Sequence, residues 1–182
     1  MRHAITNPMI SENSTADSQR ATLKIEGPEL QAQDECEAIL RSVPEWFGIE
    51  ASLLEYVANT AKLPTFFMRE DTRVLGFISL RQHFEHAWEI DCIAMHAVSR
   101  NRGLGGLLLR HAERWLVTQG ARFLQVKTIA ATSPNPHYAQ TRAYYERMGF
   151  APLEIFPELW DPRNPCLQML KTLDAAILTQ GE

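Results

Sequence analysis

A glycine-rich segment that leads directly into an apolar run is the feature that most constrains this chain. Residues 100–106 read Arg-Asn-Arg-Gly-Leu-Gly-Gly, and Leu107, Leu108 and Leu109 follow at once. Glycine lets a backbone turn tightly and approach a ligand closely, and a helix N-terminus carries unpaired N–H groups and a partial positive charge. Because an apolar strand-like stretch, 90–95, precedes the segment, the order strand, loop, helix predicts a phosphate or pyrophosphate site. A plain structural turn is the alternative.

A second motif lies further along the chain, where residues 145–150 read Tyr-Glu-Arg-Met-Gly-Phe. Together the two motifs resemble the GCN5-related N-acetyltransferase (GNAT) family. The family's loop pattern, Arg/Gln-x-x-Gly-x-Gly/Ala, matches at Arg100, Gly103 and Gly105, and its Tyr-Glu-x-x-Gly-Phe pattern matches the second motif. The resemblance covers about residues 65–171.

Hydrophobic periodicity and turn residues predict a mixed α/β (α+β) fold. The predicted helices are 34–42, 50–62, 104–119 and 136–148, and the predicted strands are 21–26, 65–69, 74–81, 86–95, 122–130, 151–155 and 166–172. A proline-rich loop, 157–165, is predicted between the last two strands. The strand–helix–strand order around 104–119 implies a parallel pair with a right-handed crossover. The resemblance implies a mixed, twisted sheet of about seven strands, flanked by helices and splayed at the cofactor site.

Length and composition predict one domain, 21–182, after a flexible tail, 1–20, that is rich in Ser, Asn and Thr and lacks periodicity. The net charge is −4 with no basic tract, so nucleic acid is not expected as a partner. No apolar run approaches the roughly 20 residues that span a bilayer, so no membrane segment is expected. The cysteines, Cys36, Cys92 and Cys166, are widely separated and none is in a Cys-x-x-Cys pair, which favours a reducing cytoplasm and gives no indication of zinc.

The resemblance implies acetyl-CoA as the co-substrate. Its pyrophosphate would lie on the backbone N–H groups of the loop, with Arg100 and Arg102 as charge-assisted donors; solvated surface charge is the alternative for both arginines. The backbone of Ile93 and Met95 would bind the pantetheine amides as an added strand does. The loop residues whose N–H groups are implied are Arg102, Gly103, Leu104, Gly105 and Gly106.

The resemblance also implies direct attack of a neutral amine on the thioester, with Tyr145 as the acid for the leaving thiolate. A packed aromatic is the alternative for Tyr145, and the neighbouring Tyr144 is predicted to lie in the core. Glu89 and Asp91 are two apart on one strand and share a face, so either is a candidate general base or substrate anchor. A structural hydrogen bond or a surface ion pair is the alternative for both carboxylates.

Two segments that pair an aromatic residue with an acid are candidates for the acceptor pocket, and they contain Trp46, Phe47 and Trp160. Such a lining suits a cation with an apolar body; core or edge packing is the alternative. His83 and His86 are three apart but face opposite sides of a strand, so no metal is expected.

The resemblance implies an acetyl-CoA-dependent N-acetyltransferase, expected here to be cytoplasmic and to act on a primary amine of a small molecule, and a homodimer is left open. The alternatives are acetylation of a protein N-terminus or lysine, and a non-catalytic acyl-CoA-binding regulatory module. A generic nucleotide-binding protein or a hydrolase is disfavoured, because the sequence has no Gly-x-x-x-x-Gly-Lys-Ser/Thr, Gly-x-Gly-x-x-Gly or Gly-x-Ser-x-Gly motif.

Overall fold

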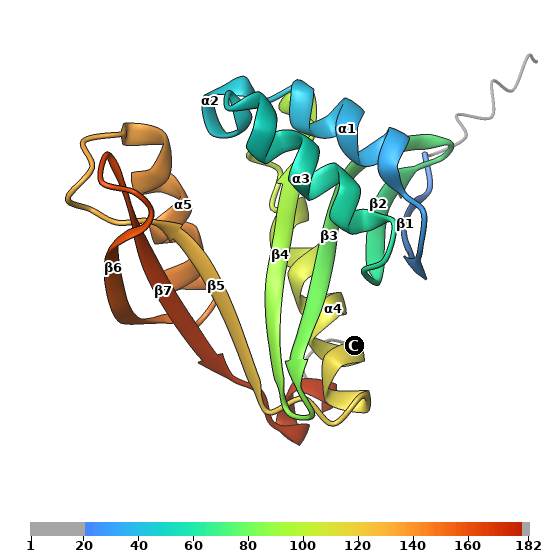
Figure 1. Cartoon of the computed structure of the whole chain (residues 1–182). Helices are drawn as coiled ribbons and strands as arrows, with labels where there is room; N and C mark the ends of the chain where they lie inside the picture. The colour runs from blue at the N-terminus through green and yellow to red at the C-terminus, as the bar shows by residue number, and fades with distance from the viewer. Residues whose placement is uncertain (1–20, 180–182) are drawn as a thin grey trace, which may run out of the picture.

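The computed structural model describes residues 21–179, and the predicted flexible tail, 1–20, lies outside them. Its centre is a mixed sheet of seven strands in the order β1-β2-β3-β4-β5-β7-β6, as expected for the resemblance (Figure 1). All neighbours pair antiparallel except β4 and β5, which pair in parallel. The strands are β1 (Leu23–Glu29), β2 (Thr65–Glu70), β3 (Arg73–Phe84), β4 (Ala87–Met95), β5 (Phe123–Ile129), β6 (Ala151–Asp161) and β7 (Asn164–Thr172).

Helices cover both faces of the sheet. In Figure 1, α1 and α3 lie in front of the strands and α4 lies behind them. Each side has its own buried cluster, because alternate residues of the strands point to opposite faces. The α-helices are α1 (Gln33–Arg41), α2 (Pro44–Phe47), α3 (Glu50–Thr60), α4 (Leu104–Thr118) and α5 (Pro136–Arg147), with short 3-10 helices η1 (Ala97–Ser99) and η2 (Ala175–Thr179).

α4 packs through an i, i+4 stripe of buried residues, Leu104, Leu108, Ala112 and Leu116, which is the pattern of an amphipathic helix. The chain reverses after its last turn at Gly120, whose φ of 78° is in the left-handed region. α4 connects the parallel strands β4 and β5, as the predicted crossover requires.

The sheet departs from the predicted strands at both ends. β1 continues through Gly27 and Pro28 to Glu29, with a register shift against β2, rather than stopping at Glu26. The predicted loop 157–165 is wrong, because β6 runs to Asp161 and β7 begins at Asn164, so the two strands form a hairpin. β6 is the edge strand, where proline is tolerated, and its register with β7 shifts between Phe156 and Asp161.

β4 carries a β-bulge at Asp91, because Ser79 of β3 pairs with Cys92 whereas Leu80 pairs with Ile90. One extra residue shifts the alternation of side chains by one position. Before the bulge the even-numbered residues of β4 pack on the α4 side of the sheet, and after it the odd-numbered residues do. The β4 side chains on the α4 side are Trp88, Ile90, Ile93 and Met95, and those on the side of α1 and α3 after the bulge are Cys92 and Ala94.

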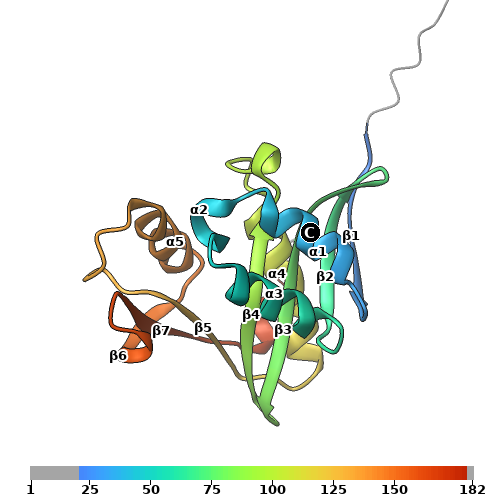
Figure 2. The same cartoon turned by 45° about the horizontal axis from the view of Figure 1, so that its top comes forward.

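The parallel pairing of β4 with β5 ends at the same point. It runs only from Ala87 opposite Phe123 to Ile90 opposite Val126. Figures 1 and 2 show the two strands diverging beyond this short ladder, with β5, β7 and β6 in one half of the sheet and β4 to β1 in the other. Within the described chain, the β5-facing edge of 91–95 therefore has no strand partner.

A buried ion pair ties α4 to the β5–β7–β6 half. The Lys171 ammonium of β7 donates to the Glu113 carboxylate of α4, with Nζ 2.6 Å from Oε1, and the Glu113 side chain is almost completely buried. The Lys171 side chain also passes beneath Gly149, where an added Cβ would lie 3.4 Å from Cε of Lys171, and its ammonium lies over the ring of Phe150. Burial raises the pKa of Glu113, and the neighbouring cations offset this only in part.

Candidate active site

The glycine-rich loop forms the N-terminus of α4, as its sequence predicts. Gly103 caps the helix with φ of 77°, a left-handed conformation that favours glycine, and an added Cβ would meet nothing within 4 Å. Four consecutive backbone N–H groups, those of residues 102–105, have no hydrogen-bond partner within residues 21–179. These donors lie at the positive end of a helix dipole, which is an arrangement that binds phosphate oxygens.

α5 closes the other side of this loop. The Tyr144 hydroxyl donates to the Gly105 carbonyl at 2.9 Å, and an added Cβ at Gly105 would lie 3.7 Å from that hydroxyl and 3.6 Å from Cγ of Met95. Tyr144 is partly buried against the core, as predicted, but its hydrogen bond to the loop is a role that the sequence did not indicate. The bond therefore joins the glycine-rich loop to the residue that directly precedes the Tyr-Glu-x-x-Gly-Phe motif.

The two arginines of the loop each have a partner. The Arg100 guanidinium lies 3.8 Å from the centroid of the Trp46 ring, and Arg102 donates to Glu70 at 3.0 Å. Arg102 is half-exposed, so this ion pair contributes little to stability. Both guanidinium groups retain N–H donors beyond these contacts.

Tyr145 is buried at the start of the second motif. Its ring makes edge-to-face contacts with Tyr144 and Phe150, at centroid distances of 5.3 and 5.5 Å, and its hydroxyl has no hydrogen-bond partner among the described residues. Burial raises the pKa of Tyr145 well above its ordinary value, and the nearby ionisable groups Tyr144, Cys92, Tyr56 and Tyr138 add to the effect. The phenol therefore stays protonated at neutral pH, and it lies among residues of α3, β4 and α5.

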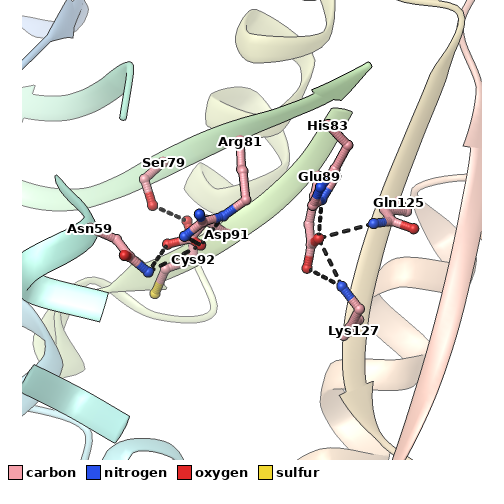
Figure 3. Close-up of polar contacts among 9 residues, drawn as sticks. All are labelled: Asn59, Ser79, Arg81, His83, Glu89, Asp91, Cys92, Gln125 and Lys127. Carbon is pink, nitrogen blue, oxygen red and sulfur yellow. Dashed lines mark hydrogen bonds and ion pairs between the residues drawn. The ribbon is translucent and has the colours of Figure 1, made fainter. Parts of the chain in front are cut away.

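Asp91 is at the bulge and lies close to α3 (Figure 3). Its Oδ1 accepts from Nε and Nη2 of Arg81, at 3.0 and 2.7 Å, while the Asn59 amide lies 3.3 Å from each carboxylate oxygen. Burial raises the pKa of Asp91, and the charge and hydrogen bonds of Arg81 and Asn59 offset this only in part. Oδ2 thus keeps an acceptor position that no short hydrogen bond occupies.

Glu89 lies beside Asp91 in a second polar cluster (Figure 3). Lys127 donates to both of its carboxylate oxygens at 2.8 Å, and Gln125 and His83 contact Oε2 at 2.9 and 2.5 Å. Burial alone would raise the pKa of Glu89, but the hydrogen bonds from Lys127 and His83 and the Lys127 charge outweigh it, so the pKa is lowered. The shared face expected for Glu89 and Asp91 is present, yet their environments shift their pKa values in opposite directions.

The predicted acceptor residues do not form one group. The Trp46 indole donates to Thr141 Oγ1 of α5 at 3.0 Å, and the Trp46 carbonyl accepts from the Tyr138 hydroxyl at 3.0 Å, so α2 and α5 meet at this residue. Phe47 contacts the Tyr56 ring edge-to-face at 5.8 Å. Trp160 is exposed on the edge strand β6, and no ring contact or hydrogen bond joins it to Trp46 or Phe47 in the described chain.

Several polar residues of the site escaped the sequence analysis because each acts through a neighbour on another strand or helix. The signal was the polar residues at alternate positions in part of each strand, Ser79, Arg81 and His83 toward the end of β3 and Gln125 and Lys127 in β5. His83, considered only for zinc, binds Glu89 instead. The residues missed are Asn59, Tyr56, Arg81, Gln125 and Lys127.

Within residues 21–179, no cluster of three or more His, Cys, Asp or Glu side chains is placed to hold a metal ion. No helix in this part of the chain has the length and apolar character needed to cross a membrane.

Comparison with known proteins identifies the family. The profile of the Acetyltransferase (GNAT) family matches residues 32–150, which is more than half of the 182 residues, and the chain belongs to this family. The protein is thus a GNAT acetyltransferase, and the predicted fold class is confirmed. Comparison with curated protein sequences gives no match.

Solved structures of GNAT proteins share the fold at low sequence identity. A GNAT-family protein from Desulfovibrio desulfuricans has a TM-score of 0.71 and 19% identity, with 84% of this chain and 100% of that chain covered. The ribosomal-protein-S18-alanine N-acetyltransferase from Escherichia coli has a TM-score of 0.67 and 19% identity, covering 84% and 95%. An aminoglycoside 6'-N-acetyltransferase complexed with coenzyme A has a TM-score of 0.64 and 18% identity, covering 83% and 97%.

Proposed function

We propose that this protein is an N-acetyltransferase that moves the acetyl group of acetyl-CoA to a primary amine of a small molecule, by direct attack in a ternary complex. The observation that carries the proposal is the row of four unpartnered N–H groups at residues 102–105, placed at the end of a sheet that opens next to them. Acetyl-CoA supplies an acetyl thioester whose carbonyl carbon an amine can attack. Coenzyme A bound to a fold of this kind, in the aminoglycoside 6'-N-acetyltransferase, supports the proposal.

The residues present fit the two polar parts of acetyl-CoA. The N–H groups of residues 102–105 would hold the pyrophosphate, with Arg100 and Arg102 as additional donors after they leave Trp46 and Glu70. The Gly106 N–H, which the sequence also predicted for this role, already donates to the Gly103 carbonyl at 3.1 Å. The free edge of β4, including the backbone of Ile93 and Met95, would bind the pantetheine amides by main-chain hydrogen bonds. A side chain at Gly105 would narrow the space between Met95 and Tyr144, which fits close approach of a ligand at this position.

Tyr145 is proposed as the general acid. Its hydroxyl is protonated at neutral pH and free of protein partners, so its proton is available to a leaving thiolate. Its ring is fixed on both sides by aromatic neighbours, which orients the hydroxyl without using it.

Asp91 is proposed as the general base, in preference to Glu89. A base that accepts a proton from an ammonium group works best when its pKa is shifted toward the working pH, and burial shifts the pKa of Asp91 in this direction. The pKa of Glu89 is shifted the other way, and its oxygens already accept from Lys127, His83 and Gln125. Glu89 is then a positioning residue for the side chains around it.

Replacing Asp91 with asparagine is expected to lower kcat/KM at pH 7 by at least about ten-fold, because the isosteric amide keeps an acceptor for Arg81 but cannot take a proton. In the unchanged protein, kcat/KM should rise with pH through the raised pKa of Asp91, since only the ionised carboxylate is a base. The variant should lose this limb of the pH–rate profile. Glu89→Gln is the matched comparison, and a larger loss for Glu89→Gln than for Asp91→Asn would transfer the role to Glu89.

A small acceptor is preferred over a protein. Trp46, Phe47 and Tyr56 provide aromatic surface beside the opening of the sheet, on the side of α2 and α3. Trp160 lies on the β6–β7 hairpin, so it would contact the acceptor only where this hairpin lines the acceptor pocket. Acetylation of a protein N-terminus stays as the second candidate, because the Escherichia coli relative by fold is named for an alanine of a ribosomal protein.

The test is calorimetric titration of the full chain with acetyl-CoA, followed in the same sample by a thiol-release screen over amino acids, polyamines, aminoglycosides and short peptides. Binding together with release of thiol on one class of amine is the expected result. Binding without any acceptor would favour a regulatory acyl-CoA-binding module instead. Absence of binding to every acyl-CoA would overturn the proposal.

A further inference from the structure

A row of polar side chains crosses four neighbouring strands on the face of the sheet that carries Asp91. We name this row the polar strip. Two of its members adjoin the point where β4 and β5 separate: Asp91 directly follows the last paired residue of β4, and Lys127 directly follows that of β5. The strip consists of Arg81 and His83 of β3, Glu89 and Asp91 of β4, Gln125 and Lys127 of β5, and Gln168 of β7, whose amide bonds to Gln125.

The carboxylates of the strip are largely buried, whereas its basic side chains are partly exposed. The side chains of Asp91 and Glu89 are 8% and 12% exposed. Those of the basic residues are 37% for Arg81, 35% for His83 and 26% for Lys127. A molecule that approaches the strip therefore contacts the N–H donors of the basic residues first. The carboxylates of Asp91 and Glu89 lie deeper and balance the charge of Arg81 and Lys127.

The basic groups also keep unused donors. Arg81 donates from Nε and Nη2 to a single oxygen of Asp91, so the protons of Nη1 are available to another acceptor. Lys127 has three ammonium protons and only two carboxylate oxygens of Glu89 within hydrogen-bond distance. The buried acids hold both cations in place, so their free donors are oriented before any ligand binds.

We propose that the polar strip binds a carboxylate of the acceptor, so that the enzyme acetylates amines that also carry a carboxylate, such as amino acids. This inference rests on the proposed acetyltransferase function and specifies its substrate class. With the carboxylate on Lys127 and Arg81, the amine of a short acceptor lies near Asp91, where β4 and β5 separate. An aminoglycoside or a polyamine would bring only positive charge to these cations and would be disfavoured.

The test compares each amino acid with its own carboxamide in the thiol-release assay, using the full chain. The amide keeps the side chain and the amine but lacks the negative charge, and its amine is less basic, which by itself favours reaction of the amide. We expect kcat/KM for the best amino acid to exceed that for its amide by at least about ten-fold, which corresponds to about 1.4 kcal/mol. An amide equal to or better than the acid overturns the inference while leaving the acetyltransferase proposal intact.

Lys127→Met is expected to raise KM for the amino acid at least about ten-fold and to change KM for the amide less than about two-fold, because only the acid uses the ammonium group. Since the single variant leaves the Glu89 carboxylate without its main partner, a second variant, Lys127→Met with Glu89→Gln, tests the same point without an unpaired charge. Lys62→Met is the control, as Lys62 is exposed and lies after α3. An equal change in KM for the acid and for the amide would overturn the inference. If the unchanged protein instead turns over no amine at all, the proposed acetyltransferase function itself is overturned.

Discussion

Replacing Lys171 with methionine is expected to lower the free energy of unfolding by about 3–5 kcal/mol, because it leaves the buried Glu113 carboxylate without a partner. For a chain of this size the midpoint of thermal unfolding should fall by on the order of 10 °C. Methionine fills most of the volume of the lysine stem beneath Gly149, so the loss reports on charge rather than on a cavity. The measurement is denaturant unfolding followed by far-ultraviolet circular dichroism.

The pH dependence of the Lys171→Met variant separates this explanation from simple loss of packing. Burial already places the pKa of Glu113 above its ordinary value, and removal of the ammonium raises it further. A carboxyl whose pKa is higher in the folded than in the unfolded state stabilises the fold when protonated, and this contribution is lost as pH rises toward the folded-state pKa. The difference in stability between the variant and the unchanged protein should therefore be larger at pH 8 than at pH 5.

The double variant Lys171→Met with Glu113→Gln provides the control. It removes both charges, and it should recover a large part of the stability that the single variant loses. A single variant as stable as the unchanged protein, or a double variant less stable than the single one, would show that the ion pair does not hold α4 to β7.

Replacing Tyr145 with phenylalanine is expected to lower kcat by at least about ten-fold and to leave the affinity for acetyl-CoA within about two-fold. Phenylalanine keeps the edge-to-face contacts with Tyr144 and Phe150 and removes only a hydroxyl that bonds to nothing in the described protein. Single-turnover kinetics and calorimetry give the two quantities separately. Because the pKa of Tyr145 is far above neutrality, its ionisation should not reduce the rate of the unchanged enzyme at moderately alkaline pH.

Tyr144→Phe is the matched control for that experiment, since it removes a hydroxyl from the adjacent ring. The Tyr144 hydroxyl donates to Gly105 in the proposed pyrophosphate site, so its loss should weaken acetyl-CoA binding more than it slows turnover. Unchanged kcat in Tyr145→Phe would remove Tyr145 as the acid. A reversal of the two effects would assign the acid role to Tyr144.

The parts of the molecule that the sequence predicted correctly are those coded by adjacent residues. The loop with Gly103 and Gly105 could be placed at the start of α4, because a glycine turn followed by an apolar i, i+4 stripe is a local pattern. The parallel pair β4–β5 followed from the order of elements. Both predictions needed only short-range information.

The parts that escaped depend on partners distant in the chain. The bulge at Asp91 is visible only as a register against β3, since the alternation of apolar residues in β4 gives no sign of an inserted residue. The proline-rich segment was predicted as a loop because Pro157 and Pro165 disfavour a central strand, whereas β6 is an edge strand. The opposite pKa shifts of Glu89 and Asp91 depend on tertiary structure: burial raises the pKa of Asp91 despite its hydrogen bonds, whereas Lys127 and His83 outweigh burial and lower the pKa of Glu89.

The bulge at Asp91 also bears on how such an enzyme can evolve. Downstream of the bulge, the proposed contacts of β4 with acetyl-CoA use main-chain groups. The side chains of Ile93 and Met95 are therefore constrained by their packing against the core rather than by these contacts. At and before it, Glu89 and Asp91 lie on the opposite face among residues of three other elements, α3, β3 and β5, where substitutions alter charge without touching the cofactor edge. A single inserted residue thereby divides one strand into two segments whose side chains serve different parts of the site. Acceptor preference can then drift while the donor site is retained, in keeping with a shared fold among relatives less than 20% identical to this chain whose names specify different acceptors.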